Sequence, residues 1–145
     1  MAVDYQLSFR PNGNNADLFA WRPDFLDSYQ IKGYKKEIKK LPFAEKAKIL
    51  GQTENGIEGT YDPTIRSSKV KWIPKSREFQ GLYERIAQEI MMHNQQHWKF
   101  DLTTLREQIQ YTEYHAEDKG KYDWHLDIGS GWSSLRKISV TINLS

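Results

Sequence analysis

The period at which apolar residues recur changes once along this chain, near residue 100, and this change constrains the fold more than any other feature. Before it, two segments place apolar residues three or four positions apart, the spacing of one helix face. They predict helices over residues 28–41 and 77–97. After it, apolar and polar residues alternate in short runs separated by glycine, which is typical of strands. Helices followed by antiparallel strands predict a domain of the α+β class.

Local signals set the limits of the predicted helices and strands. Asp27 or Ser28 is the candidate N-cap of the first helix, and Pro42 ends it. Residues 45–50 fit either a strand or a further helical turn, and the glycines within residues 51–64 predict a loop. The alternating runs predict strands over residues 65–74, 106–115, 122–128 and 137–145.

No internal repeat or linker divides the 145 residues, so we expect one domain. Residues 1–24 are a polar N-terminal segment, residues 25–100 a helical support that includes one strand, and residues 101–145 the first strands of a sheet. The last predicted strand runs to Ser145 with no turn or helix after it. Because an unpaired apolar strand is an aggregation hazard, we expect the natural protein to continue beyond Ser145, or this strand to pair with a partner.

The composition excludes several classes of function. The absence of cysteine excludes disulfides, thiolate metal sites and cysteine nucleophiles. A net charge of +2 gives little attraction for nucleic acid, and the lysines of residues 32–40 fit a solvated helix face. No apolar run has the length of a membrane span, and the first residues lack the pattern of a secretory signal. We expect a cytoplasmic protein that binds neither nucleic acid nor a membrane.

The predicted strand 122–128 carries the strongest candidate for chemistry. His125 and Asp127 are two residues apart, so a strand would direct both side chains to one face. An imidazole and a carboxylate are two of the three ligands in the facial triad of non-haem Fe(II) oxygenases, which leaves open positions for a cosubstrate and O₂. A zinc hydrolase could use the same two ligands. A surface strand with a solvated histidine and aspartate is the alternative without function.

The other polar candidates give weaker signals. His93 and His97 have the i, i+4 spacing of zinc ligands, but Asn94 stands where a metalloprotease has its glutamate, so a polar helix end is the favoured interpretation. His115 has no partner at ligand spacing. Arg136 lies at the start of the last predicted strand. It is either a charged residue that prevents further strands from pairing with the sheet edge, or a cation beside a pocket that binds a carboxylate or a peptide.

Five segments of the sequence together resemble a known family. They read RSSKVKWI, HNQQHWKFDL, QIQYTEY, GKYDWHLDIGSG and RKISVTINLS, and the resemblance spans about residues 25–145. The family is that of the prolyl 4-hydroxylase-like Fe(II)/2-oxoglutarate dioxygenases, in particular the short stand-alone enzymes of bacteria and phages, including the PKHD-type hydroxylases. The resemblance implies that N-terminal helices support a double-stranded β-helix (a jelly-roll, or cupin-like barrel), of which this sequence holds the first strands. It also implies the cytoplasm of a bacterium or of a phage-infected cell.

The resemblance implies roles for individual residues. His125 and Asp127 match the first two iron ligands. The residues matched to cofactor contacts are Tyr114, which corresponds to the tyrosine that hydrogen-bonds 2-oxoglutarate, Tyr122 and Asn143, where many members have a tyrosine. The residues matched to substrate contacts are Trp124 and Arg136.

The function implied by the resemblance is hydroxylation of an unactivated C–H bond, with a prolyl residue of a peptide or protein as the expected substrate and with succinate and CO₂ as products. Fe(II), 2-oxoglutarate and O₂ are the implied cofactor and cosubstrates, and ascorbate is a further candidate. The family's third ligand, a histidine, and its basic anchor for 2-oxoglutarate lie on later strands, beyond Ser145. We therefore expect residues 1–145 alone to bind iron poorly and to be inactive, and the complete gene product to be active.

Two alternatives remain open from the sequence. One is a barrel of the same fold that does not catalyse and that holds a peptide or a glycan in an aromatic groove. The other is the zinc hydrolase, for which no general base is evident near His125 and Asp127.

Overall fold

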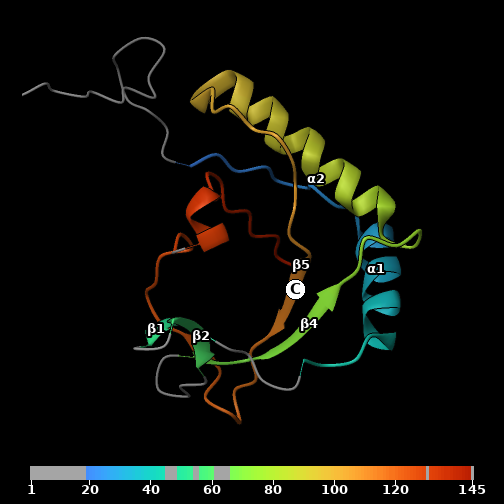
Figure 1. Cartoon of the computed structure of the whole chain (residues 1–145). Helices are drawn as coiled ribbons and strands as arrows, with labels where there is room; N and C mark the ends of the chain where they lie inside the picture. Colours follow the sequence, from blue (N-terminus) through green and yellow to red (C-terminus); the bar gives the residue numbers. More distant parts are fainter. Residues whose placement is uncertain (1–18, 45–48, 54–55, 61–65, 130, 145) are drawn as a thin grey trace, which may run out of the picture.

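The α+β class is confirmed by a computed structural model, which describes residues 19–44, 49–53, 56–60, 66–129 and 131–144. Within these ranges the chain forms two α-helices and three pairs of short antiparallel strands. In Figure 1 both helices lie on one side of the strands β4 and β5, and the segment that carries His125 and Asp127 lies on the other side.

Helix α1, Ser28–Lys40, begins at the predicted residue. The Asp27 side chain accepts a hydrogen bond from the Gln30 backbone N–H at 2.7 Å, and the Gln30 side chain accepts one from the Asp27 N–H at 3.0 Å. This reciprocal capping box satisfies two backbone donors that a helix start leaves without partners. At the other end the buried Lys71 donates to the carbonyl of Ile38 at 3.1 Å, which fixes α1 to a neighbouring strand.

Helix α2, Gln80–His93, continues as one π-helical turn, Asn94–Trp98, so the predicted helix over residues 77–97 is confirmed. The turn ends at Lys99, whose φ of 56° is left-handed. The buried Asn94 side chain accepts from the Phe100 N–H at 2.9 Å and donates to the Phe100 carbonyl at 2.8 Å. These bonds supply partners for the backbone where the helix stops.

Strands β4, Lys69–Ile73, and β5, Ile109–Glu113, pair antiparallel and connect the helices to the candidate site. The hydroxyl of buried Tyr83 on α2 donates to the Ile73 carbonyl at 2.6 Å and accepts from the Ile109 N–H at 2.9 Å, so one side chain ties α2 to both strands. The buried core cluster between helices and strands consists of Leu26, Ile38, Ile73, Phe79, Leu82, Tyr83 and Ile86. The predicted strands 65–74 and 106–115 are thus confirmed.

Strand β6, Lys121–Tyr122, continues the line of β5 instead of folding back beside it. It pairs antiparallel with β3, Arg66–Ser67, which directly precedes β4. Residues 114–120 form a loop between β5 and β6, and in this loop the His115 carbonyl accepts from the Gly120 N–H at 2.8 Å and from the Asp118 N–H at 3.2 Å. The runs 106–115 and 122–128 thus each contribute a strand of an antiparallel pair, but they do not pair with each other, because the loop between them closes on itself and brings β6 to β3, just before the partner of β5.

Gly120 is required at the neck of this loop. A Cβ at this position would lie 2.7 Å from the His115 backbone nitrogen. Real Cβ atoms do not approach backbone atoms so closely, so any other residue would force the loop open.

A hairpin replaces most of the predicted loop over residues 51–64. Strands β1, Ile49–Thr53, and β2, Gly56–Thr60, pair antiparallel with Thr53 opposite Gly56. The strand alternative for residues 49–50 is thus correct, while residues 45–48 and 61–64 lie outside the described part of the chain. The turn residues of the sequence were misread as a loop because the apolar positions between them are few.

Two further strand predictions were wrong. Of the run 122–128 only Tyr122 lies in a strand, and residues 136–144 contain no strand in the described structure, although their apolar residues alternate. Ile142 and Leu144 pack against the core cluster instead, and the Leu144 carbonyl accepts from Lys35 at 3.2 Å. A strand is stable only when a neighbour pairs with its backbone, so alternation alone does not produce one.

None of the helices in the described ranges is long and apolar enough to cross a bilayer.

Candidate functional site

His125 and Asp127 meet as predicted, although they do not lie on a strand. His125 Nε2 is 3.2 Å from Asp127 Oδ1. The backbone bends at Trp124 and at Asp127, and the side chains of Trp124 and Leu126 point to solvent with exposed fractions of 100% and 82%. The two ligand candidates therefore meet across a bent segment and not through the alternation of a strand.

The orientation of the His125 ring determines what can lie between the two side chains. Nδ1 is 2.8 Å from the Asp123 carbonyl, which can only accept, so Nδ1 carries a proton and donates it there. In neutral imidazole the lone pair of Nε2 then faces the carboxylate of Asp127, and two acceptors face each other. A metal ion bound between the two acceptor atoms would remove their mutual repulsion.

An aromatic ring supports the imidazole from one side. The rings of Tyr122 and His125 stack with their centroids 3.6 Å apart and their planes 14° from parallel. Tyr122 is held in β6, so the stack connects the histidine to the sheet. A histidine that is stacked and hydrogen-bonded through Nδ1 keeps Nε2 in one place, as ligand histidines do in metal sites.

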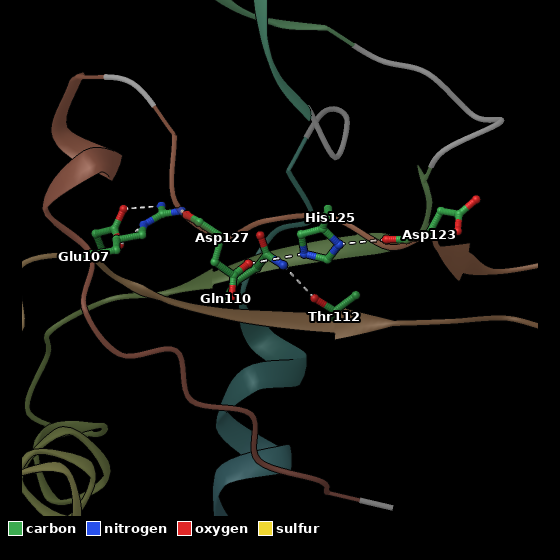
Figure 2. Close-up of polar contacts among 7 residues, drawn as sticks. Glu107, Gln110, Thr112, Asp123, His125 and Asp127 are labelled. Atoms are coloured by element: carbon green, nitrogen blue, oxygen red, sulfur yellow. Dashed lines mark hydrogen bonds and ion pairs between the residues drawn. The ribbon is translucent and has the colours of Figure 1, made fainter. Parts of the chain in front are cut away.

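Arg136 joins the backbone of the motif to Glu107, which lies at the end of Figure 2 opposite Asp123. Its Nε donates to Glu107 Oε2 at 2.8 Å, its Nη2 donates to Glu107 Oε1, and its Nη1 donates to the Asp127 carbonyl at 2.7 Å. The hydrogen bond to Glu107 raises the pKa of the Arg136 guanidinium above its usual value. The cation therefore remains charged at every physiological pH.

The adjacent face of β4 and β5 forms the floor beside this pair. Gln110 and Thr112 are on one face of β5, their side chains share a 2.9 Å hydrogen bond, and they point toward His125 and Asp127 in Figure 2. Trp72 and Val70 are their partners on β4, so the same face carries an indole that is half exposed and a buried valine. The floor combines two polar groups with apolar surface.

The other predicted site residues do not take part in the contacts described above. Tyr114 follows the end of β5 with its side chain about half exposed, and Trp124 is fully exposed. Asn143 lines a separate cleft of about 500 Å³, formed by residues 20–26, α2 and residues 138–143. The structure thus joins Tyr122 and Arg136 to His125 and Asp127, and it places Tyr114, Trp124 and Asn143 outside these contacts.

The remaining histidines take part in local contacts. His93 and His97 stack with centroids 5.7 Å apart at the end of α2, and His93 Nε2 lies 3.3 Å from Glu89 Oε1. His115 Nε2 lies 3.0 Å from Glu113 Oε2 in the loop after β5.

The donor atoms of His125 and Asp127 fit a metal ion in part. Two adjacent ligands of an octahedral ion with bonds of about 2.1 Å lie about 3 Å apart, close to the separation of Nε2 and Oδ1. Among the described residues, however, no group of three histidine, aspartate or glutamate side chains is arranged to hold a metal ion. The pair therefore supplies two ligands of a site that needs at least one more.

Three contributors to the site were missed from the sequence: the carboxylate of Glu107, the carbonyl of Asp123 and the Gln110–Thr112 pair. Gln110 and Thr112 could have been found, because alternation along the predicted strand places them on one face. Glu107 could not, because it is 29 residues from Arg136 and nothing in the spacing joins them. A backbone carbonyl leaves no signal in the sequence.

Comparisons with known proteins give no assignment: no family model matches the chain, no curated protein matches it, and no solved structure matches it.

Proposed function

We propose that His125 and Asp127 are two ligands of an Fe(II) site in a 2-oxoglutarate-dependent hydroxylase. The observation that carries this proposal is the pair itself: an Nε2 and an Oδ1 3.2 Å apart, with the imidazole proton fixed on Nδ1 by the Asp123 carbonyl. Both atoms are acceptors aimed at one point, which is the requirement for a shared cation.

The same proposal extends to the fold. β4 and β5 carry helices on one face and the candidate ligands on the other, and this layering suits the first strands of a double-stranded β-helix with its site inside. In that architecture the third ligand and the anchor for 2-oxoglutarate come from strands other than those described. The exposed run of Trp124, Leu126 and Ile128 is then a surface for such a neighbour.

The residues of this chain have defined tasks in the proposed enzyme. Fe(II) with 2-oxoglutarate and O₂ would supply the oxidising chemistry that hydroxylates a C–H bond. His125 and Asp127 hold the metal ion, and Tyr122 keeps the imidazole in place by stacking. The floor of Trp72, Gln110 and Thr112 positions the substrate, for which we propose a prolyl residue of a peptide. Tyr114 is proposed as a hydrogen-bond donor to 2-oxoglutarate.

The first experiment uses the protein as its gene encodes it, under anaerobic conditions, with Fe(II) and 2-oxoglutarate. A weak visible charge-transfer band is expected in the wild type, and His125→Ala and Asp127→Ala should each abolish it. His93→Ala and His97→Ala are matched controls, because they remove imidazoles that stack at the end of α2, and they should leave the band unchanged. A band that survives in both motif variants would refute the iron assignment.

A binding module without catalysis is the second candidate, and the solvent-exposed side chains of Trp124 and Leu126 favour it. Such a module would use these apolar groups to hold a peptide or a glycan. The two functions differ in one measurement. The hydroxylase should form succinate from 2-oxoglutarate in the presence of a proline-containing peptide, whereas the module should bind the peptide equally well with and without Fe(II).

A further inference from the structure

We infer that Glu107 is a positioning residue for Asp127 and acts through Arg136. We call these two side chains the Glu107–Arg136 clamp. The inference rests on the proposed function only in taking Asp127 as a metal ligand. The clamp itself concerns the backbone of Asp127, which can be measured without a metal ion.

The clamp joins two distant parts of the chain through one planar group. Both carboxylate oxygens of Glu107 accept from Arg136, through Nε at 2.8 Å and through Nη2. The remaining arm, Nη1, donates to the Asp127 carbonyl at 2.7 Å. Two parallel bonds to a carboxylate fix the plane of a guanidinium, so the direction of the third bond is fixed as well.

The location of the clamp explains why Asp127 needs it. Residues 123–128 follow β6 without a strand ladder, so the pairing that holds β5 and β6 does not extend to the motif. Glu107 lies two residues before β5, whose position is fixed by β4 and by Tyr83 of α2. The clamp thus transfers the fixed position of the sheet to the carbonyl of a candidate ligand.

The strength of the clamp comes from its geometry more than from burial. The side chains of Arg136 and Glu107 are 33% and 56% exposed, and a single exposed ion pair would contribute little. The clamp should contribute more than a single ion pair, because Arg136 makes two bonds to one carboxylate and a third to a carbonyl, and these partners belong to different segments of the chain. Three of the five guanidinium N–H groups are used in this way.

This role differs from that of a substrate-binding cation at the rim of a pocket. If Arg136 held substrate, Arg136→Met would change only kinetics with the peptide, and Glu107→Gln would have little effect. If the clamp positions Asp127, both substitutions change the metal site in the absence of any substrate. Their effects should also not add, because either one alone opens the clamp.

The test titrates the intact protein with Co(II) alone and follows the visible absorbance of the bound ion. Glu107→Gln and Arg136→Met should each weaken Co(II) binding by about threefold to tenfold, less than the roughly tenfold or more that buried partners of metal ligands contribute, because the clamp is partly exposed. The double variant should resemble either single variant. Glu37→Gln is the matched control, because it breaks the ion pair with Lys40 on α1 and should leave the affinity unchanged.

A second measurement on the metal-free protein makes the two proposals separable. The Asp127 carbonyl and the Ile128 N–H belong to one peptide group, so the Ile128 amide resonance should shift in Glu107→Gln and stay in place in Glu37→Gln. The clamp would be refuted if the Ile128 resonance does not move in Glu107→Gln. It would also be refuted if the wild type binds Co(II) through His125 and Glu107→Gln binds Co(II) with the same affinity. If His125→Ala does not change Co(II) binding, the proposed function is refuted. If the Ile128 resonance still shifts in Glu107→Gln, the clamp remains in place.

Discussion

The two halves of this molecule use apolar residues in opposite ways. In the region formed by the two helices with β4 and β5, the apolar stripes are buried, and Phe79 at their centre retains an exposed fraction of only 2%. In the segment after β6 the apolar residues alternate just as regularly, yet Trp124 is fully exposed and Leu126 nearly so. Both patterns are clear in the sequence, and only one of them leads to packing within the described structure.

The difference shows how helices and strands depend on their surroundings. A helix makes its backbone hydrogen bonds within itself, so α1 and α2 need only one apolar face to dock. A strand makes its bonds to a neighbour, and the run 123–128 has none in the described structure, so it bends at Trp124 and at Asp127 instead of forming a strand. His125 and Asp127 still meet, because they are only two residues apart and the bent segment brings their side chains to 3.2 Å.

The largest expected effect is a contrast in stability between the two regions. Phe79→Ala removes a buried ring that stacks on Tyr34 and should lower the free energy of unfolding by about 3–5 kcal/mol. Trp124→Ala removes a larger ring in full exposure and should change the free energy by less than about 0.5 kcal/mol. Urea unfolding of the two variants measures both values, and similar losses would show that the motif segment is packed as the helices are.

The next effect concerns the link between α2 and the sheet. Tyr83→Phe removes one buried hydroxyl and leaves the Ile73 carbonyl and the Ile109 N–H without their partner, which should cost about 1–3 kcal/mol. Tyr29→Phe, at an exposed position of α1, is the control and should have no measurable effect. If the two variants unfold at the same urea concentration, the core does not depend on this contact.

A smaller effect should appear within the motif segment. Tyr122→Ala removes the ring stacked on His125, a contact expected to contribute about 0.5–1.5 kcal/mol, whereas Tyr122→Phe keeps the ring. The ring protons of His125 lie over the tyrosine face, so their NMR resonances should be shifted upfield in the wild type and in Tyr122→Phe. They should return to ordinary positions in Tyr122→Ala. An identical histidine spectrum in all three proteins would contradict the stack.

The smallest expected effect concerns the free energy of unfolding at acidic pH. Burial raises the pKa of Glu113, but hydrogen bonds with His115 and Tyr111 outweigh it and bring the pKa below its usual 4.5. Folding therefore favours the charged carboxylate, and this stabilisation is present above the ordinary pKa and is lost as the pH falls through the lowered one.

Glu113→Gln should consequently reduce the loss of stability on acidification, by less than about 1 kcal/mol between about pH 7 and pH 3. Unfolding curves measured at several pH values give this difference. If the free energy of unfolding falls more steeply with decreasing pH in Glu113→Gln than in the wild type, the charged Glu113 carboxylate does not stabilise the fold.

Much of the helical region could be predicted because its signals are local. The Asp27 cap and the stop at Pro42 each depend on residues a few positions away, and the structure places both as expected. The hairpin of β1 and β2 is local too, with Thr53 opposite Gly56, and it was missed because its strands hold few apolar residues. The pairing of β6 with β3 could not be predicted, since it joins Tyr122 to Arg66. Strand pairing joins residues far apart in sequence, and no short pattern encodes the partner.

The sequence by itself determined that His125 and Asp127 lie two residues apart, and this spacing keeps their side chains near each other even in a bent segment that is not a strand. The Asp123 carbonyl that accepts from His125 is likewise a local contact, two residues away along the chain. Only the tertiary structure decided that the Glu107–Arg136 clamp holds Asp127, because residues 131–136 return the chain to the residues before β5. Short spacing along the chain brings these neighbouring groups together, and contacts across the fold decide which distant groups hold them in place.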